Sequence, residues 1–202
     1  LSAYSYYLEG RVELVQNRPG VAAQLFSRIP SCRLDNLDLA LTLTRGLCEL
    51  GQAEAARALL LPLESTGRNH PGYWEALVTV AFAAKDPELL LRAATEAVAL
   101  SPTSWPVRNN YAVALVIARQ RPAEAIEETF ALTLQFPQNR TIAINHALAL
   151  LQNLRYAEAD RLLAGLEAST LTESECAFYY LACGETLVGQ RRFELARRFL
   201  DE

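Results

Sequence analysis

Residues 71–102 read PGYWEALVTVAFAAKDPELLLRAATEAVALSP, and this stretch decides the fold prediction. Apolar residues recur in both halves at the spacing of three and four residues that marks one face of an α-helix. Between the halves, Asp86 can cap a helix N-terminus and Pro87 suits the first helical position. The stretch therefore predicts two helices, over about 71–84 and 87–99, joined by a tight turn.

The second of these helices carries a small or apolar residue early in its length, and that feature recurs along the whole chain. It is found at Ala22, Ala56, Leu90, Ala125, Ala159 and Ala196, at intervals of 34, 34, 35, 34 and 37 residues. Two antiparallel helices pack closely only where one of them has a small side chain at the crossing. The interval therefore predicts one helix pair in about every 34 residues.

This period, and the residues in phase with it, resemble the tetratricopeptide repeat family. In residues 71–102, the aromatic, leucine, small and closing proline places of that family are filled by Trp74, Leu77, Ala81 and Pro102. Other units carry parts of the pattern, namely Tyr6, Gly10 and Phe26 in the first, Tyr156 in the fifth, and Tyr180, Gly184 and Phe193 in the last. Two leucine places are filled by Glu9 and His146, and residues 119–121 shift the fourth unit by one.

The resemblance implies an all-α fold class, an α-solenoid of six tetratricopeptide-like helix-turn-helix repeats wound into a right-handed superhelix. Residues 1–202 would form a single array with approximate repeats at 3–36, 37–70, 71–104, 105–139, 140–176 and 177–202. First helices are expected at 2–16, 36–50, 71–84, 105–119, 140–153 and 174–188. Second helices are expected at 19–29, 52–64, 87–99, 122–135, 155–167 and 191–202.

The turns and the last helix add two expectations. Gly51, Gly67 and Gly189 are predicted to lie at turns, where a helix end often needs a left-handed residue. The last predicted helix reaches Glu202 with no polar capping helix after it, although solenoid ends need caps for solubility. We therefore expect either self-association through this uncapped C-terminal end or a continuation of the chain in a longer protein.

The composition narrows the classes of partner. Of the 202 residues, 51% are hydrophobic and 21% are charged, which predicts a folded chain. The net charge of −4 gives no basic field for a nucleic acid. No apolar run approaches the roughly 18 residues that span a bilayer, so no membrane insertion is expected. The four cysteines show no C-x-x-C spacing and are interpreted as packed thiols. A cytoplasmic location is expected, although the native N-terminus is not visible.

Catalytic chemistry is not predicted. His70 and His146 are the only histidines and stand about two repeats apart, so they form neither a metal cluster nor a histidine-based triad. His70 is interpreted as an exposed loop residue and His146 as a buried, hydrogen-bonded one. There is no G-x-S-x-G, phosphate loop or dinucleotide fingerprint. We therefore expect a non-enzymatic protein with no catalytic residue, metal or cofactor.

The resemblance implies that the first helices line a concave groove, which takes an extended peptide or a partner's helix. The polar residues expected in the groove are Arg11, Thr42, Arg45, Thr79, Asn109, Asn110, Asn145 and Gln152, among the apolar residues Leu14, Phe82, Val116, Ile117 and Leu151. Arg11 and Arg45 lie 34 residues apart and should stack on adjacent repeats. Asn110 and Asn145 lie 35 apart and should stack likewise, where their amides could hold a peptide backbone.

Two alternatives stay open for these residues. The arginines could instead form surface salt bridges with Glu13, Asp38 or Glu49, and the asparagines could brace neighbouring helices. The full set of Lys, Asn and Arg with which some members of the family grip a C-terminal carboxylate is missing, so such a clamp is not expected.

The function expected from the resemblance is that of a scaffold or adaptor that binds a protein or peptide in its groove. One alternative is a regulatory or substrate-presenting repeat segment of a larger enzyme, such as a glycosyltransferase. Another is a protein that binds a cytoskeletal polymer and resembles kinesin light chain, although the repeats of that protein are longer.

Overall fold

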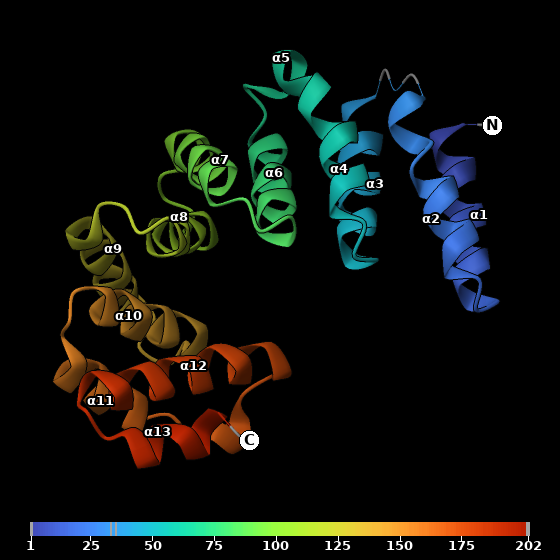
Figure 1. Cartoon of the computed structure of the whole chain (residues 1–202). Coiled ribbons are helices and arrows are strands. Elements are labelled where there is room, and N and C mark those ends of the chain that lie inside the picture. The colour runs from blue at the N-terminus through green and yellow to red at the C-terminus, as the bar shows by residue number, and fades with distance from the viewer. Residues whose placement is uncertain (1, 33, 35, 201–202) are drawn as a thin grey trace. The chain divides into compact units, whose positions relative to one another are not determined.

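The computed structural model describes residues 2–32, 34 and 36–200, and every regular element among them is a helix (Figure 1). The prediction of an all-α fold is confirmed. By their contacts the residues divide into two compact units, Leu1–Pro102 and Thr103–Glu202.

Unit 1 is built of helix pairs that follow one another along the chain. Its α-helices are α1 (Ala3–Val15), α2 (Pro19–Phe26), α3 (Leu37–Glu49), α4 (Ala53–Leu60), α5 (Glu64–Gly67), α6 (Pro71–Ala83) and α7 (Pro87–Leu100), and its 3-10 helices are η1 (Ile29–Ser31) and η2 (Leu61–Leu63). The pairs α1/α2, α3/α4 and α6/α7 each pack together. Helix α6 also packs on both α3 and α4, which joins the second pair to the third.

Unit 2 has the same organisation. Its helices are α8 (Trp105–Ile117), α9 (Pro122–Gln135), α10 (Arg140–Gln152), α11 (Tyr156–Ala164), η3 (Ala168–Thr170), α12 (Glu173–Gly189) and α13 (Phe193–Leu200). The pairs are α8/α9, α10/α11 and α12/α13. Helix α10 lies at the centre of the unit and packs on α8, α9, α11 and α12.

The twelve predicted helices are present, but several second helices end earlier than predicted. The helix predicted over 19–29 ends at Phe26, and the one over 52–64 ends at Leu60. Pro30 and Pro62 follow these ends and lie in η1 and η2. Because proline has no backbone N–H and clashes with the preceding turn, the α-helix cannot continue through it. The structure adds the short helix α5, which the sequence did not predict. The last two residues of the helix predicted over 191–202 lie outside the described residues.

The turn within each pair has the same backbone conformation. A residue with positive φ stands there in all six pairs, at Asn17, Gly51, Lys85, Arg119, Leu154 and Arg191, at intervals of 34, 34, 34, 35 and 37 residues. The following N–H donates to the carbonyl five residues before it, as from Arg18 to Glu13 and from Arg155 to Leu150. This is the Schellman closure of a helix C-terminus. Five of the six positions hold a residue other than glycine.

Two of the three predicted turn glycines have a different role. Gly51 is left-handed as predicted, with φ of 71°. Gly67 and Gly189 are instead the last residues of α5 and α12, with no positive φ. A Cβ atom at Gly67 would overlap the Tyr73 ring, and one at Gly189 would overlap the Tyr156 ring. These glycines are needed because an aromatic ring packs directly on the backbone.

Helix crossings are close where the sequence predicted them to be. The residues at the six predicted crossings are all buried, with exposed fractions of 3% or less: Ala22, Ala56, Leu90, Ala125, Ala159 and Ala196. The cap predicted at Asp86 is also confirmed, and Thr172 supplies a second one. The Asp86 carboxylate accepts from the Leu89 N–H, and Thr172 forms a capping box with Glu175.

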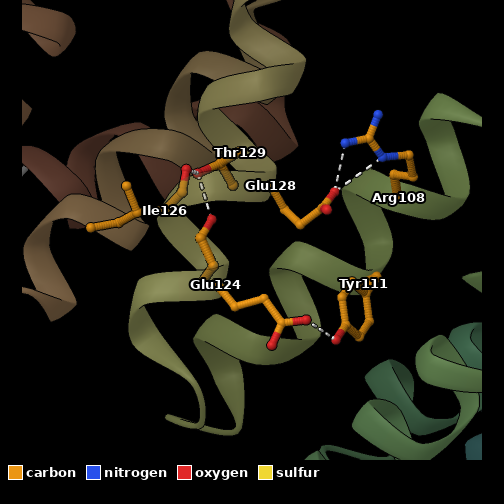
Figure 2. Close-up of polar contacts among 7 residues, drawn as sticks. Arg108, Tyr111, Glu124, Ile126, Glu128 and Thr129 are labelled. Atoms are coloured by element: carbon orange, nitrogen blue, oxygen red, sulfur yellow. Dashed lines mark hydrogen bonds and ion pairs between the residues drawn. The ribbon is translucent and has the colours of Figure 1, made fainter.

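Polar contacts reinforce the first pair of unit 2 (Figure 2). Arg108 of α8 donates through two nitrogens to one carboxylate oxygen of Glu128 on α9, at 2.8 and 3.0 Å. The Tyr111 hydroxyl donates to Glu124 at 2.5 Å. Burial and this acceptor raise the pKa of Tyr111 to about 12, so its hydroxyl keeps its proton at neutral pH. Charged and phenolic side chains thus hold α8 and α9 together beside their apolar contact.

Candidate functional site

An open pocket of about 510 Å³ lies in unit 2 among α8, α10, α12 and the turns that follow α8 and α10. Its lining residues are Val116, Ile117, Arg119, Pro122, Leu148, Leu151, Gln152, Leu154, Phe178, Leu181 and Glu185. Eight of these eleven side chains are apolar. A volume and a lining of this kind are typical of sites that bind another molecule.

Several of the apolar side chains are exposed at the pocket. Leu154 is 70% exposed, Leu181 46% and Ile117 40%. Leu181 also lines a second hollow of about 380 Å³, which extends along α12 to Val188. Single exposed apolar residues are common on protein surfaces, and a hollowed cluster of them on one face makes this surface the candidate site.

The amide of Gln152 closes the wall of the pocket between α8 and α10. Its Nε2 donates to the carbonyl of Val116 in the last turn of α8. Its Oε1 is buried and has no hydrogen-bond partner among the described residues. Gln152 was predicted to face the groove, and it does line the pocket, where one of its two N–H groups is bonded to Val116.

The asparagines are arranged differently from the prediction. Asn145 of α10 donates from Nδ2 to Oδ1 of Asn109 on α8, at 2.9 Å, and Asn109 is only 9% exposed. Asn110 was predicted to stack with Asn145, but Asn110 is exposed. The residue that Asn145 contacts is Asn109, which precedes Asn110 in the sequence. Successive residues of a helix are rotated by about 100°, so Asn109 faces α10 while Asn110 points to solvent. The Asn109–Asn145 bond is a brace between first helices.

In unit 1, the predicted groove residues Arg11, Thr42, Arg45 and Thr79 are all exposed. The hydroxyls of Thr42 and Thr79 donate to carbonyls of their own helices, those of Asp38 and Glu75. Because these bonds are local, the threonines do not tie neighbouring helices together.

The two arginines form no ion pair with any other residue that the structure describes. The Arg11 guanidinium lies over the Tyr7 ring at 5.8 Å. Glu13, one of the acidic residues considered as a partner, pairs with Arg18 at 2.6 Å. Arg11 and Arg45 thus remain available as positive charges on the exposed face of α1 and α3.

His146 is buried between α9 and α10, as predicted. Its Nδ1 lies 2.8 Å from the Thr129 hydroxyl, which itself donates to the Ala125 carbonyl at 2.7 Å. A hydroxyl has one proton, so the imidazole donates from Nδ1–H and the hydroxyl accepts. Burial, with Arg155 as a smaller cause, lowers the pKa of His146, and Glu158 partly opposes this. The neutral ring therefore serves the packing of α9 on α10.

Other chemistry is sparse in the described part of the chain. It contains no group of three or more His, Cys, Asp or Glu side chains placed to hold a metal ion. The four cysteines are free thiols, and His70 is exposed at the start of α6. No helix among the described residues is long and apolar enough to cross a membrane.

Most of the residues that line the pocket were not among the predicted site residues. The predicted residues were polar residues only, and of these Gln152 alone lines the pocket. Val116, Ile117 and Leu151 were expected as apolar residues of the groove, and they do line it. Leu154 and Leu181 were missed. A signal for Leu154 was present in the sequence, because the equivalent positions of the other five turns hold glycine or a polar residue.

No family model matches the chain, and no curated protein sequence matches it, so the interpretation of the pocket depends on the geometry described above.

Proposed function

We propose that the chain is a tetratricopeptide-like solenoid of six repeats that acts as a scaffold or adaptor, without catalysis, by binding a segment of another protein. The observation that carries the binding is the apolar pocket of unit 2, whose exposed leucine and isoleucine side chains face an open volume large enough for several side chains of a partner.

Three observations support the repeat. Consecutive helices pack in pairs. In unit 2 each pair packs on the next, and in unit 1 the third pair packs on the second, while η1 contacts both α1 of the first pair and α4 of the second. The buried residues at the helix crossings recur at 34 to 37 residues. The left-handed turn residues also recur at 34 to 37 residues, although the residue type at these positions varies. In solenoid proteins each repeat contacts the repeats next to it along the chain.

The proposal is tested by affinity capture from a lysate of the source cells, followed by mass spectrometry. Leu154→Glu places a charge at the pocket, and Leu134→Glu on α9 is its matched control, because the two leucines are 70% and 69% exposed and Leu134 does not line the pocket. Both variants should fold, since neither side chain is buried. We expect a set of captured proteins that the Leu134 variant keeps and the Leu154 variant loses.

Proteins that both variants retain equally would show that binding takes place elsewhere on the chain. A catalytic activity found in the purified chain would contradict the proposal from the other side.

A further inference from the structure

We infer that a cavity of about 880 Å³ in unit 1 binds a small molecule through a planar aromatic ring. The cavity lies among the first turn of α1, the segment that contains η1, and the first turn of α3. Its described lining residues are Ser2, Ala3, Tyr4, Tyr6, Arg28, Ser31, Cys32, Leu34, Asn36 and Leu39. This cavity is separate from the pocket of unit 2, and the inference does not depend on the proposed function.

Unit 1 contains two junctions between successive helix pairs, and aromatic rings fill the second one. Tyr73 stands twelve residues before Lys85, the left-handed turn residue of the third pair. Its side chain is fully buried, and a Cβ atom at Gly67 of α5 would overlap its ring. The Trp74 ring packs edge-on against the Tyr73 ring, with the two ring centroids 5.1 Å apart. Helix α5 packs on α6 beside these rings.

At the first junction the equivalent place holds Leu39. This residue stands twelve residues before Gly51, the left-handed turn residue of the second pair, and it lines the cavity. Leu39 is partly exposed, whereas the equivalent residues Tyr73 and Ile142 are fully buried. Leucine is smaller than tyrosine, and the first junction has no counterpart of α5 among the described residues. The cavity therefore corresponds to space that side chains fill at the second junction.

The size and the lining of the cavity favour a small molecule. Sites for small molecules have volumes of about 300–1,000 Å³ and combine an apolar wall with a few polar groups. The cavity lies within this range. The guanidinium of Arg28 and the hydroxyl of Ser31 are among its polar groups, and they can bond a polar substituent on the ring.

The tyrosine rings in the wall favour an aromatic ligand over a saturated one. Tyr4 and Tyr6 both line the cavity, and Tyr4 is 49% exposed, so a ligand can reach its ring. The Arg28 guanidinium lies 5.9 Å from the centre of the Tyr6 ring. Aromatic rings attract one another in offset or edge-on arrangements, and a guanidinium stacks on a ring face. A saturated ring of the same size lacks both attractions.

The class of the ligand is tested with two compounds of nearly equal size, 2-naphthol and its saturated counterpart decahydro-2-naphthol. Their dissociation constants for the full chain are measured by ligand-observed nuclear magnetic resonance. We expect 2-naphthol to bind with a Kd below about 1 mM, and at least about fivefold more tightly than decahydro-2-naphthol, because only 2-naphthol has a π-system. Equal affinities would overturn the aromatic class, and no binding of 2-naphthol would overturn the site.

Leu39→Tyr tests where the ring binds, because it places at the first junction the residue that fills the second. We expect this variant to lose at least about tenfold in affinity for 2-naphthol and to be at least as stable as the wild type in urea, since the new side chain fills the cavity. Leu25→Tyr on α2 is the matched control, because Leu25 is also partly exposed but does not line the cavity. Its affinity should differ from that of the wild type by less than about twofold.

Tyr4→Leu is a second variant, which removes a ring from the wall and does not require a new side chain to enter the cavity. We expect it to bind 2-naphthol at least about threefold more weakly, with a smaller change for decahydro-2-naphthol. An unchanged ratio of the two dissociation constants would contradict the contact between the ligand and Tyr4.

Leu154→Glu separates the cavity of unit 1 from the pocket of unit 2. This variant should keep its affinity for 2-naphthol, because Leu154 lines only the pocket of unit 2. Binding that Leu154→Glu abolishes and Leu39→Tyr retains would place the compound in unit 2 and overturn the inference, while the proposed function would stand. A failure of the capture experiment in unit 2 would in turn leave the cavity of unit 1 untouched.

Discussion

Asn109 and Asn145 show how far a repeat period can place a single side chain. The period indicated that an amide on one first helix lies near an amide on the next, and the structure contains such a pair. It could not say that the partner is Asn109 rather than Asn110, because a shift of one residue rotates a side chain by about 100° around the helix. The difference changes the role from ligand contact to internal brace.

A double-mutant cycle between Asn109 and Asn145 tests this brace. We expect Asn145→Ala to lower the free energy of unfolding by about 1 kcal/mol, and the cycle to give a coupling energy of similar size, because each substitution removes the same interhelical bond. Urea unfolding followed by circular dichroism measures both. Asn110→Ala is the control and should change stability by less than about 0.5 kcal/mol. A zero coupling energy would mean that the bond contributes nothing to stability.

His146 makes the stability of unit 2 depend on pH. Its pKa in the folded protein is lowered below the ordinary value of 6.5. Between the two values the unfolded chain binds more protons, so the free energy of unfolding falls as pH falls through that window and is fully restored above about 6.5. His146→Asn keeps an N–H near the Thr129 hydroxyl but does not titrate. The urea concentration at the midpoint of unfolding is measured between pH 5.5 and 7.5. As pH is lowered, this midpoint should decrease more steeply for the wild type than for His146→Asn, and equal slopes would contradict the lowered pKa of His146.

At the scale of elements, Gly67 fixes how the end of α5 packs on α6. Tyr73 is fully buried, and its ring leaves no room for a Cβ atom at Gly67. We expect Gly67→Ala to lower the free energy of unfolding by about 1–3 kcal/mol through overpacking. Gly20→Ala on α2 is the matched control, because a Cβ atom at Gly20 would meet nothing within 4 Å. That control should be neutral or stabilise by up to about 1 kcal/mol. Thermal melts that rank the two variants in the opposite order would show that α5 packs differently.

Local signals predicted where helices begin better than where they end. Asp86 and Thr172 act within one turn of their own positions, so their caps can be identified from sequence alone. The partner of Arg92 could not be identified in this way. Arg92 pairs with Glu64 and lies over the Trp74 ring, because the fold brings distant residues together. Leu181 in the pocket was missed for a related reason, since a leucine in the sequence does not show whether it will be buried or exposed.

For the whole molecule, the two compact units predict two independently folding fragments. Each unit has its own buried residues, such as Leu77 in unit 1 and Leu150 in unit 2. We expect fragments 1–102 and 103–202, expressed separately, to give helical circular dichroism spectra and cooperative urea transitions. Trp74 reports on the first fragment and Trp105 on the second, since they are the only tryptophans. A fragment that is helical only when the other is added would show that the units depend on each other.

The six left-handed turns form equivalent joints between the two helices of each pair. Each joint has the same backbone conformation and the same closing hydrogen bond, whether its residue is asparagine, glycine, lysine, arginine or leucine. A gene rearrangement that joined residue 17 to residue 52 would therefore restore an intact joint and remove one pair's length of chain. Duplications and deletions in this phase would lengthen or shorten the protein by whole helix pairs, without an insertion inside any helix.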